Sequence, residues 1–144
     1  MNSMHLVTLG VRDFQRSLQF YRDGLGFLVY GEVDGEAEIV FFRTRGTKLA
    51  LYPYEELLHD IGIDEPPVKP VFSGITIAFN AKSRDEVDAV MLHAKGAGAK
   101  IVKEPEDTFW GGYSGYFADP DGYIWEVAYG EMWEFDEKDM LVME

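Results

Sequence analysis

The chain contains no cysteine. This absence excludes disulfides, thiolate nucleophiles and cysteine-ligated metals, and it fits a cytoplasmic protein. Basic residues are also scarce, because 13 Lys and Arg stand against 26 Asp and Glu, for a formal net charge of -13. Nucleic acids and anionic membranes are bound through clustered Lys and Arg, so we expect neither as a partner.

Long apolar runs are missing as well. No stretch approaches the length that crosses a membrane, and the first residues show no basic region followed by an apolar one, so we expect no secretory signal. The chain does have material for a core, since 47% of its 144 residues are hydrophobic and 15% are aromatic. One compact domain is the default at this length.

The most informative stretch runs from Trp110 to Trp133 and is typical of two strands joined by a tight turn. The turn, residues 118–122, reads Ala-Asp-Pro-Asp-Gly, in which Pro120 presets a turn dihedral and Gly122 accepts a left-handed backbone. Alternation along the second strand places Glu126 between two apolar neighbours. A carboxylate in that position is solvated, paired, or bound to something else.

The first half of the chain predicts the order βαβββ. Asp13 is a helix N-cap candidate after the opening strand, and apolar residues then recur at helical spacing as far as Leu25. Asp34-Gly35 predicts a hairpin turn, and Pro66-Pro67 ends regular structure in the linker. The expected strands are 6–11, 27–33, 36–43 and 48–52, with a short helix at 54–61.

The second half predicts the same order again. Ser83 and Glu86 have the spacing of a capping box ahead of an amphipathic helix. The expected strands are 71–79 and 100–103, followed by a loop at 105–111 and the hairpin. We therefore predict an α+β fold of two βαβββ modules whose curved mixed sheets enclose a cleft. The divisions are module one 4–53, linker 54–70, module two 71–130 and an acidic tail 131–144.

The tail combines charge with apolar side chains. It holds six acidic residues and one Lys, together with Trp133, Phe135 and several Met residues. One interpretation is a partly ordered acidic end. The other is that its apolar residues dock on a partner subunit or cover the cleft, because large aromatic side chains are costly to leave in water.

Three segments resemble the vicinal oxygen chelate superfamily, which groups glyoxalase I, bleomycin-resistance proteins, fosfomycin-resistance enzymes and extradiol dioxygenases. Residues 7–27 match its opening strand, its "D…S…FY" helix and its "LGF" exit. Residues 74–79 and the following helix match the second module, and residues 119–127 match the "DPDG…E" ending. The resemblance is specific for the fold and weak for the reaction, because this fold hosts isomerases, lyases, dioxygenases and plain binders.

Metal-dependent members of that family hold a divalent ion in the cleft. Carried over by position, the final-strand ligand falls on Glu126, but the others fall on Leu6, on Gly74 and near Ala50, so one of four is retained. His5 lies one residue from Leu6, which on a strand turns it to the opposite face, and it becomes a ligand only through a bulge or register slip. We therefore expect no metal cofactor, with a divalent metal as the alternative.

The predicted cleft is lined by strand residues of one parity. Ser114 and Tyr116 match positions that face the active site in fosfomycin-resistance relatives. Trp110 either stacks on a bound ring at the mouth of the cleft or packs in the core. The candidate catalytic residues are Glu126 and Tyr116. The predicted ligand-binding residues are Glu126, Tyr116, Ser114, Trp110, Thr8, Thr76 and Tyr52.

Three functions compete. The first is a metal-free protein of the bleomycin-resistance type that binds a small molecule. The second is an enzyme of lyase, isomerase or dioxygenase type, with a non-standard divalent metal site that includes Glu126, or with Glu126 and Tyr116 as acid and base. The third is an accessory protein whose tail mediates association. The family resemblance also implies a homodimer.

Overall fold

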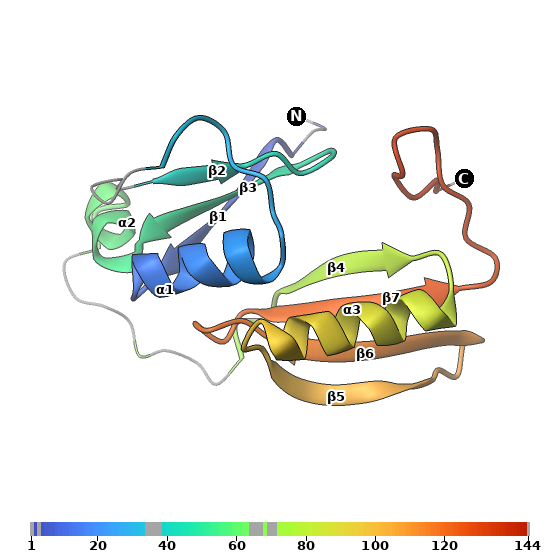
Figure 1. Ribbon diagram of the computed structural model, residues 1–144. Coiled ribbons are helices and arrows are strands. Elements are labelled where there is room, and N and C mark those ends of the chain that lie inside the picture. Colours follow the sequence, from blue (N-terminus) through green and yellow to red (C-terminus); the bar gives the residue numbers. More distant parts are fainter. Residues whose placement is uncertain (1, 3, 34–38, 64–67, 69–71, 144) are drawn as a thin grey trace. The chain divides into compact units, whose positions relative to one another are not determined.

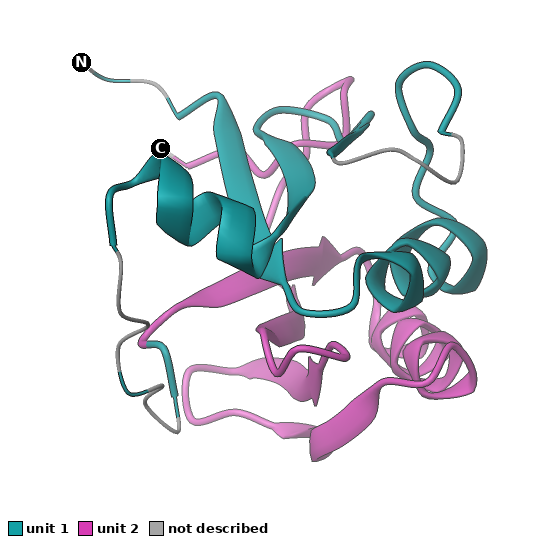
Figure 2. Ribbon diagram, turned by 90° about the vertical axis from the view of Figure 1, so that its left-hand side faces the viewer, with its two compact units in different colours: residues 1–73 teal, residues 74–144 magenta. Residues whose placement is uncertain are grey.

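The computed structural model describes residues 2, 4–33, 39–63, 68 and 72–143. The chain divides into two compact units, residues 1–73 and 74–144 (Figure 2). One unit has a three-stranded and the other a four-stranded mixed sheet, each accompanied by helices (Figure 1). The predicted α+β class is therefore confirmed, whereas the cleft between the sheets stays a prediction.

The first unit is built on a sheet in the order β1-β3-β2, in which β1 runs parallel and β2 antiparallel to β3. Asp13 caps the first helix as predicted, because its carboxylate accepts a hydrogen bond from the Arg16 amide at 3.0 Å. Tyr21 and Phe42 are fully buried in the core. The elements are β1 Leu6–Val11, α1 Phe14–Leu18, η1 Gln19–Gly24, β2 Val40–Phe42, β3 Lys48–Pro53 and α2 Tyr54–Asp60.

One strand of this unit differs from the prediction, and one predicted helix changes its type along its length. The expected strand at 27–33 is reduced to one bridge, between Val29 and Phe42, because Gly31 takes a left-handed backbone at φ 71°. The expected helix is present, but it is α-helical only over Phe14–Leu18 and π-helical over Gln19–Gly24, where Phe20 and Tyr21 are both buried. The predicted turn at 34–35 and the Pro66-Pro67 pair lie outside the described residues.

The second unit has the predicted order βαβββ. Its sheet runs β4-β7-β6-β5, with β4 and β7 parallel and the other pairs antiparallel. The helix α3 begins as predicted, since the Ser83 hydroxyl accepts from the Glu86 amide at 3.1 Å. Met91 on this helix packs toward Gly115 of the sheet. The elements are β4 Thr76–Ala81, α3 Arg84–Gly96, β5 Lys100–Asp107, β6 Gly112–Ala118 and β7 Ile124–Gly130.

The strand β5 is longer than the sequence predicts. It continues to Asp107, so the predicted loop at 105–111 shrinks to residues 108–111. The register against β6 shifts between Ile101 and Lys103 and again between Lys103 and Glu106. Pro105 is tolerated there because β5 is an edge strand with an irregular ladder, where a missing amide donor costs little.

The turn between β6 and β7 has the predicted chemistry. The Asp119 side chain is 5% exposed, and its Oδ1 accepts from the amides of Asp121 at 2.9 Å and Tyr123 at 2.8 Å. Gly122 takes a left-handed backbone at φ 88°. This turn fixes the register of β6 on β7, in which Tyr116 lies opposite Glu126.

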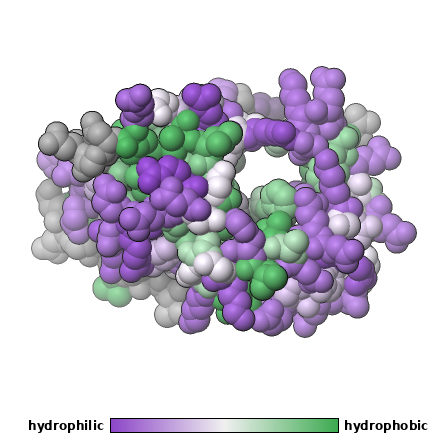
Figure 3. Space-filling model, in the orientation of Figure 1, coloured by the Kyte–Doolittle hydropathy of each residue, from purple (hydrophilic) through white to green (hydrophobic). Residues whose placement is uncertain are grey.

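The surface carries the acidic excess of the sequence. Hydrophilic side chains dominate the face shown in Figure 3, in keeping with the net charge of -13. Among the described residues, no helix combines the length and the apolar character needed to cross a membrane.

Removing the turn carboxylate tests how the hairpin is fixed. We expect Asp119→Ala to lower the free energy of unfolding by about 2 kcal/mol, because the amides of two half-buried residues lose a charged acceptor. Urea unfolding followed by circular dichroism measures the change. Asp119→Asn keeps a side-chain oxygen at the same place and retains most of the stability. Equal unfolding midpoints for Asp119→Ala and the native chain would contradict the assignment.

Candidate functional site

Glu126 is paired with a tyrosine across the sheet. Tyr116 on β6 lies directly opposite Glu126 on β7, and its hydroxyl donates a hydrogen bond to Glu126 Oε1 at 2.8 Å. Both side chains belong to the face of the sheet that points away from α3, because Gly115, the neighbour of Tyr116, packs against Met91 of the helix. We call this the open face; it carries the even-numbered residues of β4, β6 and β7.

The hydrogen bond sets the protonation of the tyrosine. It raises the pKa of Tyr116 to about 12, and desolvation and the negative charge of Glu126 act in the same direction. The phenol is therefore neutral and a donor at physiological pH. Tyr116 holds the carboxylate in place, and a phenolate base is not formed there near neutrality.

The second carboxylate oxygen of Glu126 has no protein donor among the described residues. Its only recorded hydrogen bond uses Oε1, and the side chain is half-buried. The residue facing it from β4 is Ala78, which is exposed and offers no polar group. The pair therefore presents one oriented acceptor, Oε2, above a floor of small side chains.

Two further predicted residues lie on the same face. Ser114 is next to the pair along β6, and Thr76 lies one row away on β4, opposite Ile124. Ser114 is 4% exposed. Thr76 is exposed. The face thus combines hydroxyl groups with a carboxylate, as the alternation of the sequence predicts.

Trp110 stacks on a ring of its own chain. Its indole lies 5.5 Å from that of Trp133, with an interplanar angle of 26°. A Cβ atom added to Gly112 would lie 1.9 Å from the Trp110 ring, which places this ring over the glycine on the open face. The stack therefore stands at one end of the face that carries Tyr116 and Glu126.

The remaining candidates belong to the first unit. Thr8 pairs with Ala50, and Tyr52 pairs with Gly10 one row further along the same face of that sheet. His5 precedes β1 with the opposite parity; its carbonyl accepts from the Lys48 amide at 2.9 Å, and its side chain is exposed. The structure thus groups Glu126, Tyr116, Ser114, Thr76 and Trp110 in one unit, and Thr8 and Tyr52 in the other.

Sequence reasoning missed several residues of these faces. Lys103 and Glu106 on β5 lie opposite Tyr116 and Ser114, and they form an ion pair at 2.6 Å. Lys103 lies in the predicted strand but was not assigned to this face, and Glu106 was missed because Pro105 indicates the end of the strand. In the first unit Phe41 lies opposite Ala50, as the alternation of β2 would have shown.

The donor set around Glu126 does not fit the divalent metal that the family resemblance implies. A catalytic ion needs about three protein ligands, and Glu126 is flanked across the sheet by Tyr116 and Ala78. Across the part of the chain that the structure describes, no three His, Asp or Glu side chains gather closely enough to hold an ion.

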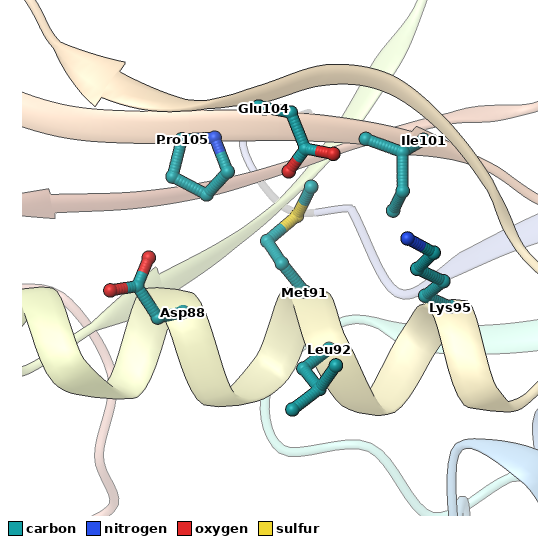
Figure 4. Close-up of a pocket in the computed structure, with 7 residues that line it drawn as sticks. All are labelled: Asp88, Met91, Leu92, Lys95, Ile101, Glu104 and Pro105. Carbon is teal, nitrogen blue, oxygen red and sulfur yellow. The ribbon is translucent and has the colours of Figure 1, made fainter.

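A groove lies on the helix side of the same sheet. It is a groove of about 130 Å³ between α3 and β5, where Met91 points toward the strand and Asp88 and Glu104 stand at the rim (Figure 4). Nearby, the Tyr113 hydroxyl donates a hydrogen bond of 2.7 Å to the Asp88 carboxylate on α3. This groove is small and lies on the face opposite Glu126, so we place the candidate site on the open face.

Comparison with known proteins identifies relatives over nearly the whole chain. A glyoxalase-related enzyme from Fulvimarina pelagi is 27% identical, with a TM-score of 0.86 over 99% of both chains. A lactoylglutathione lyase from Agrobacterium tumefaciens is 25% identical, with a TM-score of 0.68 over 94% of this chain and 99% of the other. The Bacillus subtilis (strain 168) "Uncharacterized protein YraH" is 28% identical over 84% of this chain and 93% of its own.

A family model covers the same region. The model of the Glyoxalase/Bleomycin resistance protein/Dioxygenase superfamily matches residues 3–127, which include module one, most of module two and the first half of β7 with Glu126. The solved structures above share the fold of that family. The chain therefore belongs to the Glyoxalase/Bleomycin resistance protein/Dioxygenase superfamily, the group that its opening, central and closing motifs resemble.

Proposed function

We propose that the protein binds a small molecule on the open face of the second unit, without the divalent metal used by metal-dependent members of the family. The observation that carries the proposal is the Tyr116–Glu126 pair. Its 2.8 Å hydrogen bond fixes the carboxylate and leaves Oε2 without a donor from the described protein residues. A half-buried, oriented acceptor on a sheet face is the kind of group that sets ligand orientation in a binding site.

The pair selects for ligands that donate a hydrogen bond. Oε2 of Glu126 is an acceptor only, so an N–H or O–H group on the ligand meets it best, and a cationic donor meets it most strongly. Ala78, which lies opposite Glu126 on β4, is exposed and leaves the carboxylate accessible from that side. The net charge of -13 further favours neutral or cationic ligands over anions.

The metal-free form of the proposal rests on donor chemistry. The family positions that carry metal ligands in metal-dependent members fall on Leu6 and Gly74, whose side chains coordinate nothing. The alternative is a lyase, isomerase or dioxygenase with a non-standard metal site that includes Glu126. The name of the Agrobacterium lactoylglutathione lyase favours that alternative, whereas the chemistry at Leu6 and Gly74 favours metal-free binding.

Metal content is the experiment that decides between these functions. We expect untagged protein to contain no stoichiometric metal by elemental analysis, and its melting temperature to stay unchanged with added nickel, zinc, manganese or iron. Glu126→Gln is compared with Glu104→Gln, a matched change elsewhere on the sheet. Near-stoichiometric metal, or a metal-dependent rise in melting temperature that only Glu126→Gln abolishes, would establish the alternative.

The titration of Tyr116 tests the pair itself. We expect a phenol with a pKa of about 12, measured by difference absorbance. Because Glu126 raises the folded pKa above the ordinary 10.0, the stabilisation is complete below pH 10 and is lost as the pH rises through about 12. Glu126→Gln should return Tyr116 toward its ordinary pKa, and Tyr116→Phe should remove the late step.

This titration needs one correction. Asp88 also raises the pKa of Tyr113, through their hydrogen bond, so the spectra are best recorded in a Tyr113→Phe background. In that background the late step that Tyr116→Phe removes is the one assigned to Tyr116. If no tyrosine titrates late, or if the late step survives Glu126→Gln, the hydrogen bond is not present in solution and the proposal loses its anchor.

A further inference from the structure

Two tryptophans stand over two glycines at one end of the open face. Gly112 on β6 and Gly130 on β7 are directly paired. A Cβ atom on Gly112 would lie 1.9 Å from the Trp110 ring, and one on Gly130 would lie 2.9 Å from the Trp133 ring. Both indoles therefore occupy the volume that side chains at this row would fill. Only glycine at both positions lets the stack lie directly on the backbone.

The C-terminal segment holds Trp133 in this place. Beyond it, Phe135 and Leu141 form a bridge, and the Asp136 carboxylate accepts from the amides of Lys138 at 2.8 Å and Met140 at 2.9 Å. Lys82, just after β4, forms an ion pair with Asp139 and lies 5.6 Å from the Phe135 ring. The segment is thus a closed loop fastened to the same unit that carries the open face (Figure 1).

The strand β6 sets the distance between the indole stack and the Tyr116–Glu126 pair. Gly112 and Tyr116 are four residues apart on β6, which corresponds to about 13 Å along the sheet. Ser114 and Ala128 form the row between them, and their small side chains are only 4% and 2% exposed. A ligand held at Glu126 therefore passes above this row and meets the flank of the indole stack.

We propose that Trp133 is a specificity-determining residue of the site, because the Trp110–Trp133 stack closes one end of the open face. The stack contacts the far end of a ligand whose near end is held by Glu126. Ligands long enough to reach the stack therefore bind more tightly than shorter ones. This inference rests on the proposed function and adds a residue from outside the family match, which ends at residue 127.

Two amidines of different length test the inference. Benzamidine and naphthalene-2-carboxamidine carry the same cationic N–H donor for Glu126, but the bicyclic compound extends further toward the stack. We expect Trp133→Ala to weaken binding of the bicyclic compound about tenfold, the worth of one aromatic contact, and to leave benzamidine within about twofold. Isothermal titration calorimetry on the full chain measures both, and Trp133→Phe, which keeps a ring, should retain most of the difference.

The outcomes separate the two claims. If Trp133→Ala weakens both amidines equally, or neither, the stack is not a wall of the site and the inference is overturned while the proposed function stands. If neither amidine binds the native chain, or if both bind Glu126→Gln as well as the native chain, Glu126 is not the anchor. That result overturns the proposed function, and with it the inference that the stack selects longer ligands.

A glycine substitution tests the stack without any ligand. Gly112→Ala places a methyl group where the Trp110 ring lies, so the indoles must separate. We expect the exciton couplet of the stacked indoles to disappear from the circular dichroism spectrum, together with the preference for the bicyclic amidine. Gly96→Ala, where an added Cβ meets nothing within 4 Å, is the matched control. An unchanged couplet in Gly112→Ala would overturn the placement of the stack.

Discussion

The hydrogen bond between Tyr116 and Glu126 is the contact on which the account of this protein depends. A carboxylate in the middle of a sheet is costly unless it is solvated or paired, and here it is paired on one oxygen only. The pairing requires the β6–β7 register, and the register requires the turn that Asp119 holds from within. A short acidic turn thus determines where the acceptor oxygen of the candidate site lies.

The two faces of the second sheet have different roles. On the helix side, side chains fasten α3 to the strands: Tyr113 donates to Asp88, and the Arg84 guanidinium lies 4.9 Å from the Tyr113 ring. In contacts of this kind the polar groups bind one another, so few donors or acceptors remain for a ligand. On the open face one carboxylate oxygen of Glu126 has no hydrogen-bond donor among the described residues, so it can accept a hydrogen bond from a ligand.

Local patterns in the sequence predict the hairpin and most of the open face. Alternation with a period of two places Glu126, Tyr116 and Ser114 together, and the structure has them on one face. The part of β5 beyond Lys103 was not predicted, because a proline usually ends a strand. Only the edge position of β5 and its register shifts show why Pro105 is tolerated there. The π-helical turn η1 was missed for a similar reason, since its apolar spacing imitates an α-helix.

The partner of Trp110 could not be found from the sequence. Trp133 reaches it through a tail with no periodicity, over two glycines whose pairing exists only in the folded sheet.

The central claim, that Glu126 is the ligand anchor, is tested most directly by carbon NMR of protein labelled at the glutamate carboxyl carbons. With Glu126→Gln used to assign the signal, added naphthalene-2-carboxamidine should shift the Glu126 resonance and leave the other glutamates in place. A shift at Glu104 in the groove beside α3, or no shift at Glu126, would contradict the account.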